Sequence, residues 1–174
     1  MSPLLYFSNR LIIAFIVVII DQFSKLMVKN SSLTPIPEEI LANILRFTYI
    51  ENPGLAFGVP IGNLGWLLFI ITVLITLYIL YYLLFGKNLL GSEILALNLI
   101  LGGAVGNLID RGFTLLNLFN YKGVIDFIDI GIGDFYRWPY IFNIADLNVS
   151  LGIIIFILCS YSNSKQNELE NEIT

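Results

Sequence analysis

The chain of 174 residues contains no histidine and one cysteine, Cys159, which lies in the apolar stretch "IIIFILCSY". Without histidine, the Ser–His and Cys–His nucleophile pairs and histidine-ligated metal sites are excluded. A lone cysteine cannot form an internal disulfide, and its apolar neighbours favour a small buried side chain. If the protein is an enzyme, its reactive groups are therefore carboxylates, hydroxyls, amides, lysine or arginine.

Charge is scarce as well: charged residues make up 13% of the chain, hydrophobic residues make up 57%, and the mean hydropathy is +0.83. Soluble domains have an apolar share nearer about one half. The sequence also lacks a Walker loop, a dinucleotide-binding fingerprint and a basic patch suited to nucleic acid. These features predict a small integral membrane protein that forms a single membrane domain over residues 1–174.

Four apolar stretches are long enough to cross a bilayer as helices, which takes roughly 20 residues. The crossings are predicted at about 10–29, 64–85, 94–111 and 144–161. The first resembles a secretory signal, but no small-x-small cleavage site follows it, so an uncleaved helix is predicted. The third contains four small residues that allow close helix packing in lipid, namely Gly102, Gly103, Ala104 and Gly106.

The segments between the crossings differ in character. In the segment 30–63, two prolines interrupt helix and "LRFTYI" (45–50) alternates as a strand does, which predicts a hairpin or small curved sheet against the membrane surface. The segment 112–143 is aromatic and lacks a helical pattern, and the tail 162–174 is acidic and is expected to be solvated. The fold class is thus an α-helical membrane protein with four transmembrane helices and a small extramembrane sheet and loop.

The few polar residues of this chain gather on one side of the membrane. With four crossings, the far ends of the first and third helices and the start of the fourth all emerge together. This side receives Asp21, Lys25, Asn52, Asn107, Asp110, Arg111, Asp126, Asp129, Asn143 and Asp146. The other side receives the N-terminus, the link "GKNLLGSE" and the acidic tail, so a single site on the crowded side is predicted.

Two constellations in this set favour structural roles. Asp21 and Lys25 are four residues apart, which predicts an interfacial ion pair whose lysine extends outward to water. Asp110 and Arg111 are predicted to neutralise each other, because a paired acid is less costly to bury than a single charge. Arg111 could also hold a substrate carbonyl or a lipid headgroup.

Two carboxylates favour chemistry. Asn143 is a good helix cap, but Asp146 precedes an apolar run that places it at or below the membrane interface, where carboxylates are functional candidates. Asp126 is flanked by β-branched and aromatic residues in "GVIDFI", and burial beside a second carboxylate raises a carboxyl pKa. Two such acids can share a proton, one activating water while the other protonates a carbonyl oxygen.

Five motifs, in order and at compatible spacing, resemble those of the prokaryotic lipoprotein signal peptidase (signal peptidase II) family. They are "DQFSK" (21–25), "ENPGLAFG" (51–58), "GGAVGNLIDR" (102–111), "GVIDFID" (123–129) and "FNIADLNVS" (142–150). The resemblance implies an aspartyl endopeptidase that removes signal peptides from diacylglyceryl-modified prolipoproteins, cutting just N-terminal to the lipidated cysteine. It needs no metal or cofactor, and we expect the chain to act as a monomer.

Carried over residue by residue, the resemblance assigns the catalytic dyad to Asp126 and Asp146. It assigns substrate binding or site support to Asp21, Lys25, Asn52, Gly54, Asn107, Asp110, Arg111, Asn143 and Ala145. The segment around "ENPGLAFG" is similar to the extramembrane β-cradle of the family, which packs over substrate. Asp129 is left as a structural or rim carboxylate, and the variable stretch 130–141 receives no role.

The resemblance also implies a multi-pass protein of the bacterial cytoplasmic membrane, with both termini cytoplasmic and the site on the outer side. The outer side would then hold more basic residues than the inner side, which runs against the positive-inside tendency. Two other functions are compatible with intramembrane acids: a transporter or proton relay, and a non-catalytic tetraspan assembly factor that uses the third helix as an interaction face. A transporter needs polar groups through the depth of the bilayer, whereas here they gather at one end.

Overall fold

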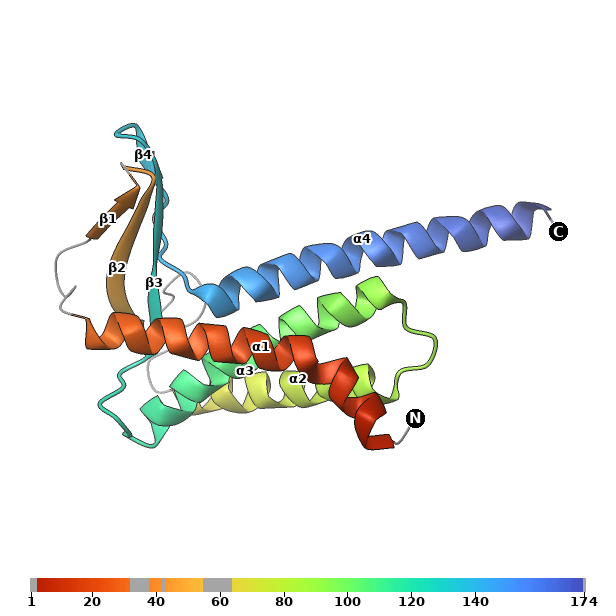
Figure 1. Ribbon diagram of the computed structural model, residues 1–174, viewed down its shortest axis with the longest axis horizontal. Helices are drawn as coiled ribbons and strands as arrows, with labels where there is room; N and C mark the ends of the chain where they lie inside the picture. The colour runs from red at the N-terminus through yellow and green to blue at the C-terminus, as the bar shows by residue number, and fades with distance from the viewer. Residues whose placement is uncertain (1–2, 32–37, 42, 55–63, 174) are drawn as a thin grey trace.

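The computed structural model describes residues 3–31, 38–41, 43–54 and 64–173 (Figure 1). Four helices form most of this part of the chain: α1 (Pro3–Asn30), α2 (Gly65–Phe85), α3 (Gly91–Leu115) and α4 (Ile144–Ile173). Each contains an apolar stretch long enough to cross a membrane. The predicted fold class is confirmed, although α4 continues to Ile173 and so includes most of the expected tail.

Helix α3 lies at the centre of the bundle and packs against the other three helices. Its glycines allow this close approach. A Cβ on Gly102 would lie 2.6 Å from the Cβ of Val17 in α1, and a Cβ on Gly103 would lie 2.7 Å from Cγ2 of Val149 in α4. The small residues of the third crossing therefore have the packing role that the sequence predicts. Helix α2, by contrast, buries only Thr76 and Leu83 and leaves most of its surface to lipid.

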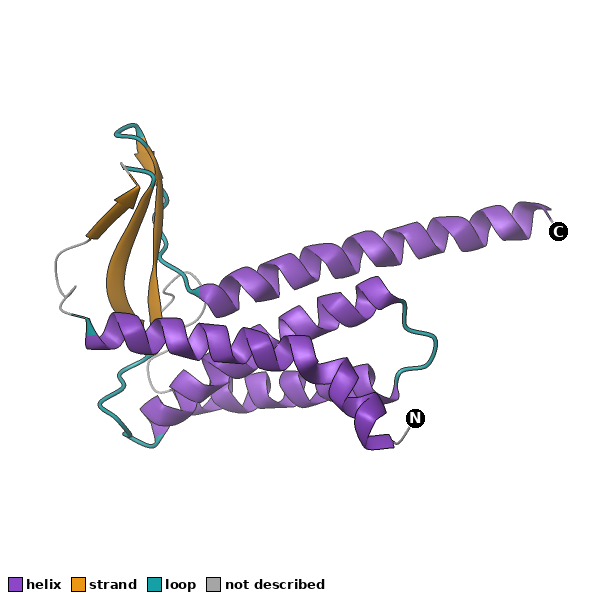
Figure 2. Cartoon of the chain, in the orientation of Figure 1, coloured by secondary structure: helices purple, strands orange, loops and turns teal. Residues whose placement is uncertain are grey.

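A four-stranded antiparallel sheet lies across one end of the bundle, where α1 ends and α4 begins (Figures 1 and 2). Its strands, in spatial order, are β1 (Glu38–Leu41), β2 (Leu45–Asn52), β3 (Val124–Ile132) and β4 (Tyr136–Arg137). The expected strand at 45–50 is thus confirmed as β2, while residues 32–37, 42 and 55–63 of the expected cradle lie outside the described residues.

Strand β3 contains the stretch "VIDFID" and joins the sheet to the bundle. Ile125 and Phe127 are buried in a hydrophobic cluster that also includes Val28, near the end of α1, and Tyr121. The antiparallel register places Ile50 of β2 opposite Asp126 and brings Asn52 opposite Val124. Packing and register together fix the position of Asp126 above the ends of the helices.

Candidate active site

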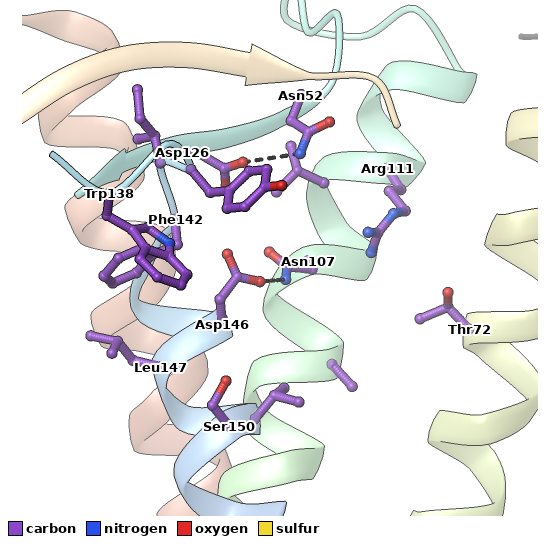
Figure 3. Close-up of a pocket in the computed structure, with 15 residues that line it drawn as sticks. Asn52, Thr72, Asn107, Arg111, Asp126, Trp138, Phe142, Asp146, Leu147 and Ser150 are labelled. Carbon is purple, nitrogen blue, oxygen red and sulfur yellow. Dashed lines mark hydrogen bonds between the residues drawn. The ribbon is translucent and has the colours of Figure 1, made fainter. Parts of the chain in front are cut away.

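Asp126 of β3 and Asp146 of α4 line the same cavity, of about 570 Å³, at the end of the bundle that carries the sheet (Figure 3). The two acids are twenty positions apart in sequence, and the chain returns from β3 through β4 to the start of α4, which brings them together. The cavity is also lined by Asn52, Thr72, Ala104, Asn107, Arg111, Val124, Trp138, Tyr140, Ile141, Phe142, Leu147, Val149 and Ser150. Of the polar residues predicted to gather on one side, Asn52, Asn107, Arg111, Asp126 and Asp146 line this cavity.

Asp126 is almost fully buried, with 3% of its surface exposed. Its Oδ1 accepts a hydrogen bond from Asn143 Nδ2 at 2.6 Å, and its Oδ2 accepts one from Asn52 Nδ2 at 3.2 Å. Burial raises the pKa of Asp126 to about 7, and the negative charge of nearby Asp146 adds to this effect. Near neutral pH this carboxyl group can therefore either hold or release a proton.

Asp146 lies in the first turn of α4 and forms a reciprocal capping box with Asn143. The N–H of Asp146 donates to Asn143 Oδ1 at 2.9 Å, and the N–H of Asn143 donates to Asp146 Oδ2 at 3.1 Å. The expected capping role of Asn143 is confirmed. Asn107 Nδ2 donates to the other oxygen of Asp146 at 2.8 Å (Figure 3), so each carboxylate oxygen accepts one N–H.

Asp21 and Lys25 form the expected i, i+4 ion pair, but the expectation that Lys25 extends outward is wrong. Both side chains are completely buried. Lys25 Nζ lies 2.9 Å from Asp21 Oδ2 and 2.9 Å from Asp110 Oδ2, and it also donates to Asn107 Oδ1 at 2.9 Å. The inward direction follows from the helix face, because these positions of α1 pack on α3, which supplies the second carboxylate.

The predicted pairing of Asp110 with Arg111 is also corrected. Asp110 pairs with Lys25, whereas Arg111 lines the cavity that contains the two acids (Figure 3). Adjacent residues of a helix point in directions about 100° apart, so one faces α1 and the other faces the cavity. Arg111 is in position to contact a molecule in the cavity.

The remaining predicted site residues contribute through the backbone. The N–H of Ala145 donates to Asp21 Oδ1 at 2.9 Å, and the N–H of Gly54 donates to Asn52 Oδ1 at 2.9 Å. The second bond holds the Asn52 amide with its Nδ2 toward Asp126. Asp129, as expected, does not line the cavity, and its carboxylate pairs with Arg137 at 2.8 Å.

Sequence reasoning missed the aromatic wall of the cavity. Trp138, Tyr140 and Phe142 line it, and they come from the stretch after β3 that received little or no functional assignment. The aromatic enrichment of this stretch was the available signal, since aromatic side chains commonly line ligand cavities. Trp138 and Phe142 lie on the opposite side of the cavity from Arg111, so the cavity joins a polar side to an apolar one (Figure 3).

Comparison with known proteins identifies the family of the chain. The family model described as signal peptidase (SPase) II matches residues 13–162. A curated lipoprotein signal peptidase of Clostridioides difficile (strain 630) is 37% identical over 155 residues, which cover 87% of this chain and 92% of the relative. Two solved structures of bacterial membrane enzymes are similar. One has a TM-score of 0.76 at 30% identity, covering 91% of each chain; the other has a TM-score of 0.70 at 33% identity, covering 87% of this chain and 92% of its own.

Proposed function

This chain belongs to the signal peptidase II family, and we propose that Asp126 and Asp146 together make it an aspartic endopeptidase. Membership supports a lipoprotein signal peptidase that acts on prolipoprotein substrates in the membrane. We assign the cut to the peptide bond just N-terminal to the diacylglyceryl-modified cysteine. The observation that carries the proposal is the presence of two carboxylates, from β3 and α4, in one cavity at the end of the bundle that carries the sheet.

In this proposal the two acids have different starting states. Asp126 has a pKa near 7 because of burial and the neighbouring charge, so a large share of the molecules hold this proton at neutral pH, and the cycle starts from that protonated form. Each acid accepts one N–H on each oxygen, so their hydrogen bonds do not distinguish them; Asp146 lines the cavity and is assigned the role of proton acceptor. The pair therefore supplies one general acid and one general base without metal or histidine.

The proposed reaction balances with these two groups and one water molecule. Asp146 takes a proton from water as the water oxygen attacks the scissile carbonyl carbon, and Asp126 gives its proton to the carbonyl oxygen. This forms a neutral gem-diol. The C–N bond then breaks as Asp146 passes its proton to the departing amine and Asp126 regains one from the diol.

The surroundings of the acids suit a lipidated peptide. Arg111 can donate hydrogen bonds to substrate carbonyl groups at the polar side of the cavity. Farther along α3 and α4, Ala104, Leu147 and Val149 add apolar surface to the lining, beside the hydroxyl of Ser150. Acyl chains can therefore stay among apolar groups while the peptide bond reaches the carboxylates. Because residues of one chain line the cavity, the proposal extends to a monomeric enzyme.

The test is cleavage of a purified diacylglyceryl-modified prolipoprotein by the wild type, Asp126→Asn and Asp146→Asn in lipid nanodiscs. Each variant is expected to insert and fold but to lose about 100- to 10,000-fold in kcat, as expected for removal of a general acid or base. Asp129→Asn is the matched control, because it removes a carboxylate three residues along the same strand that points away from the cavity. Turnover by either dyad variant at the wild-type rate would refute the mechanism.

We also propose that the site faces the outer side of the bacterial cytoplasmic membrane, with both termini inside. Most basic residues on the site side are held in ion pairs, with Lys25, Lys29, Arg46 and Arg137 each bonded to a carboxylate. These lysines and arginines still count against this orientation in the positive-inside tendency, so membership of the family carries the proposal. A periplasmic-active reporter fused after residue 30 tests the orientation, and activity only for a cytoplasmic reporter at that point would reverse it.

A further inference from the structure

A lysine without any exposed surface lies beneath the two aspartates. Lys25 and its partners Asp21 and Asp110 all have 0% of their side-chain surface exposed. An ammonium group has three N–H donors, and here each has an acceptor at 2.9 Å: Asp21 Oδ2, Asp110 Oδ2 and Asn107 Oδ1. With every donor satisfied, the direction of the Lys25 head group is fixed.

Each carboxylate of this buried triad also holds the backbone immediately before one of the proposed catalytic acids. Asp21 Oδ1 accepts the N–H of Ala145, the residue before Asp146, at 2.9 Å. Asp110 Oδ2 accepts the N–H of Ile125, the residue before Asp126, at 3.2 Å. One contact therefore holds α4 and the other holds β3. Lys25 links the two carboxylates that make these contacts.

Lys25 further determines the orientation of the Asn107 amide. Because Asn107 Oδ1 accepts from Lys25 Nζ, its Nδ2 is the end that is free to donate to Asp146 Oδ1, at 2.8 Å. The same oxygen of Asn107 also accepts from Asn143 Nδ2, which in turn donates to Asp126. A reversed amide would place an acceptor against the Asp146 carboxylate, so the lysine selects the orientation in which Asn107 donates.

The local packing is built around this triad. A Cβ on Gly106 of α3 would collide with the Asp21 carboxylate, so only glycine allows Asp21 to lie between α1 and α3. Gln22 provides further donors to the two carboxylates, because its Nε2 donates to Asp110 Oδ1 at 3.1 Å and to Asp21 Oδ2 at 3.2 Å. Three buried charges with all these partners form a rigid unit rather than a mobile one.

The geometry points to Lys25 as a positioning residue that sets the separation of Asp126 and Asp146, acting through Asp21, Asp110 and Asn107. This inference rests on the proposed two-aspartate function, and it assigns a specific role within that function to a residue that does not line the cavity. Loss of the cation would leave two like-charged buried carboxylates to repel each other. The two backbone segments that they hold would also lose the ammonium group that links them, and the Asn107 amide would be free to reverse. The segments are therefore expected to shift even in a variant that removes the repulsion.

The test compares Lys25→Met with a triple variant, Asp21→Asn/Lys25→Met/Asp110→Asn, in nanodiscs with the diacylglyceryl-modified substrate. The triple variant removes the buried repulsion and keeps side-chain oxygens that accept from Ala145 and Ile125, so it remains informative if Lys25→Met does not fold. For each folded variant we expect kcat to fall about 100-fold, as a displacement of about 1 Å produces, with KM within about threefold of the wild type.

The pH profile separates positioning from simple loss of folded enzyme. Because Asp146 raises the pKa of Asp126, moving the acids apart shifts the basic limb of the kcat profile to lower pH. Loss of the Lys25 charge, which lowers this pKa, acts in the opposite direction in Lys25→Met, so the midpoint is read in the triple variant, where the charges of Asp21 and Asp110 are removed as well. A variant that is only less stable keeps the wild-type midpoint at lower amplitude. Lys29→Met is the matched control, since it removes another lysine one turn farther along α1 and breaks the ion pair with Glu51 at 3.1 Å.

The outcomes are distinct. A lower kcat and a shifted midpoint in the triple variant, with an unshifted midpoint in Lys29→Met, support the positioning role. A folded triple variant with the wild-type kcat and midpoint overturns it, and so does an equal shift in Lys29→Met. Failure of the two-aspartate function is recognised separately, because Asp126→Asn or Asp146→Asn would then retain activity whatever Lys25 does.

Discussion

The raised pKa of Asp126 predicts that this residue makes the protein less stable at alkaline pH. Its ordinary value is 3.8 and its value in the fold is about 7, because burial and the charge of Asp146 both disfavour the ionised form. Between these values the native state binds a proton that the unfolded state has lost, so stability decreases as the pH rises from about 4 to about 7. At ~1.4 kcal/mol for each pH unit between the two values, the total is about 4 kcal/mol.

Asp126→Asn removes this dependence, because the amide has nearly the same shape and no charge. One of the two Asp126 oxygens becomes an NH₂ group that faces a donor, and the longer bond, from Asn52 at 3.2 Å, is the one expected to be lost, at a cost of about 1 kcal/mol. The variant should therefore be more stable than the wild type by about 3 kcal/mol at pH 8.5, and slightly less stable at pH 4. The substitution that removes activity is thus expected to stabilise the fold.

The measurement is equilibrium unfolding of both proteins in mixed micelles across pH 4 to 8.5, followed by the fluorescence of Trp66 and Trp138. Titration of other groups affects both proteins equally, so only the difference between the two stability curves is interpreted. Asp146→Asn provides an internal check, because without the second charge the decrease in stability should occur at lower pH. Parallel curves for the wild type and Asp126→Asn over this range would refute the assignment of the raised pKa.

Three further predictions concern packing, capping and substrate contact. Gly103→Val would force a side chain against the Ala145 carbonyl and displace α4, so thermal unfolding should show a loss of stability of more than about 2 kcal/mol. The control Gly91→Ala adds a methyl group with no neighbour within 4 Å and should change stability by less than about 0.5 kcal/mol. Asn143→Ala removes the cap of α4 and a hydrogen-bond donor to Asp126, so the fold should lose about 1 to 3 kcal/mol of stability and the enzyme should lose activity. Retention of the full kcat would contradict the role of Asn143 as a link between Asp126 and Asp146. Arg111→Gln should raise KM more than it lowers kcat, and an unchanged KM would show that this guanidinium does not contact substrate.

Much of the architecture could be predicted because it depends on local pattern. The four crossings follow from apolar length, and the close packing of α3 follows from its small residues. The strand at 45–50 follows from its alternation. The cap of α4 follows from the type of residue at position 143. Each of these signals lies within one short stretch of sequence and needs no knowledge of what packs beside it.

The partners of the charged residues could not be predicted from local pattern alone. In "VIDFID" the two acids look like a pair, but residues three apart in a strand point to opposite faces, so Asp129 pairs with Arg137 while Asp126 faces the cavity. The inward direction of Lys25 depends on Asp110, which approaches only after α1 packs on α3. Such partners come from distant segments, and the sequence alone supplied the pairing of Asp126 with Asp146 only through the resemblance to a known family.

The capping box at the start of α4 gives Asp146 a second task that changes during each turnover. Under the proposed mechanism this carboxylate becomes a neutral acid for part of the cycle, and a neutral acid is a weaker acceptor for the Asn143 N–H than an anion is. The hydrogen bond from the Asn143 N–H to Asp146 at the start of α4 therefore weakens when Asp146 gains its proton and strengthens when it loses it. Helix residues rearrange within about nanoseconds, whereas enzymes commonly turn over about 1 to 1,000 times per second. This change in the hydrogen bonding of the first turn of α4 therefore imposes no delay on catalysis.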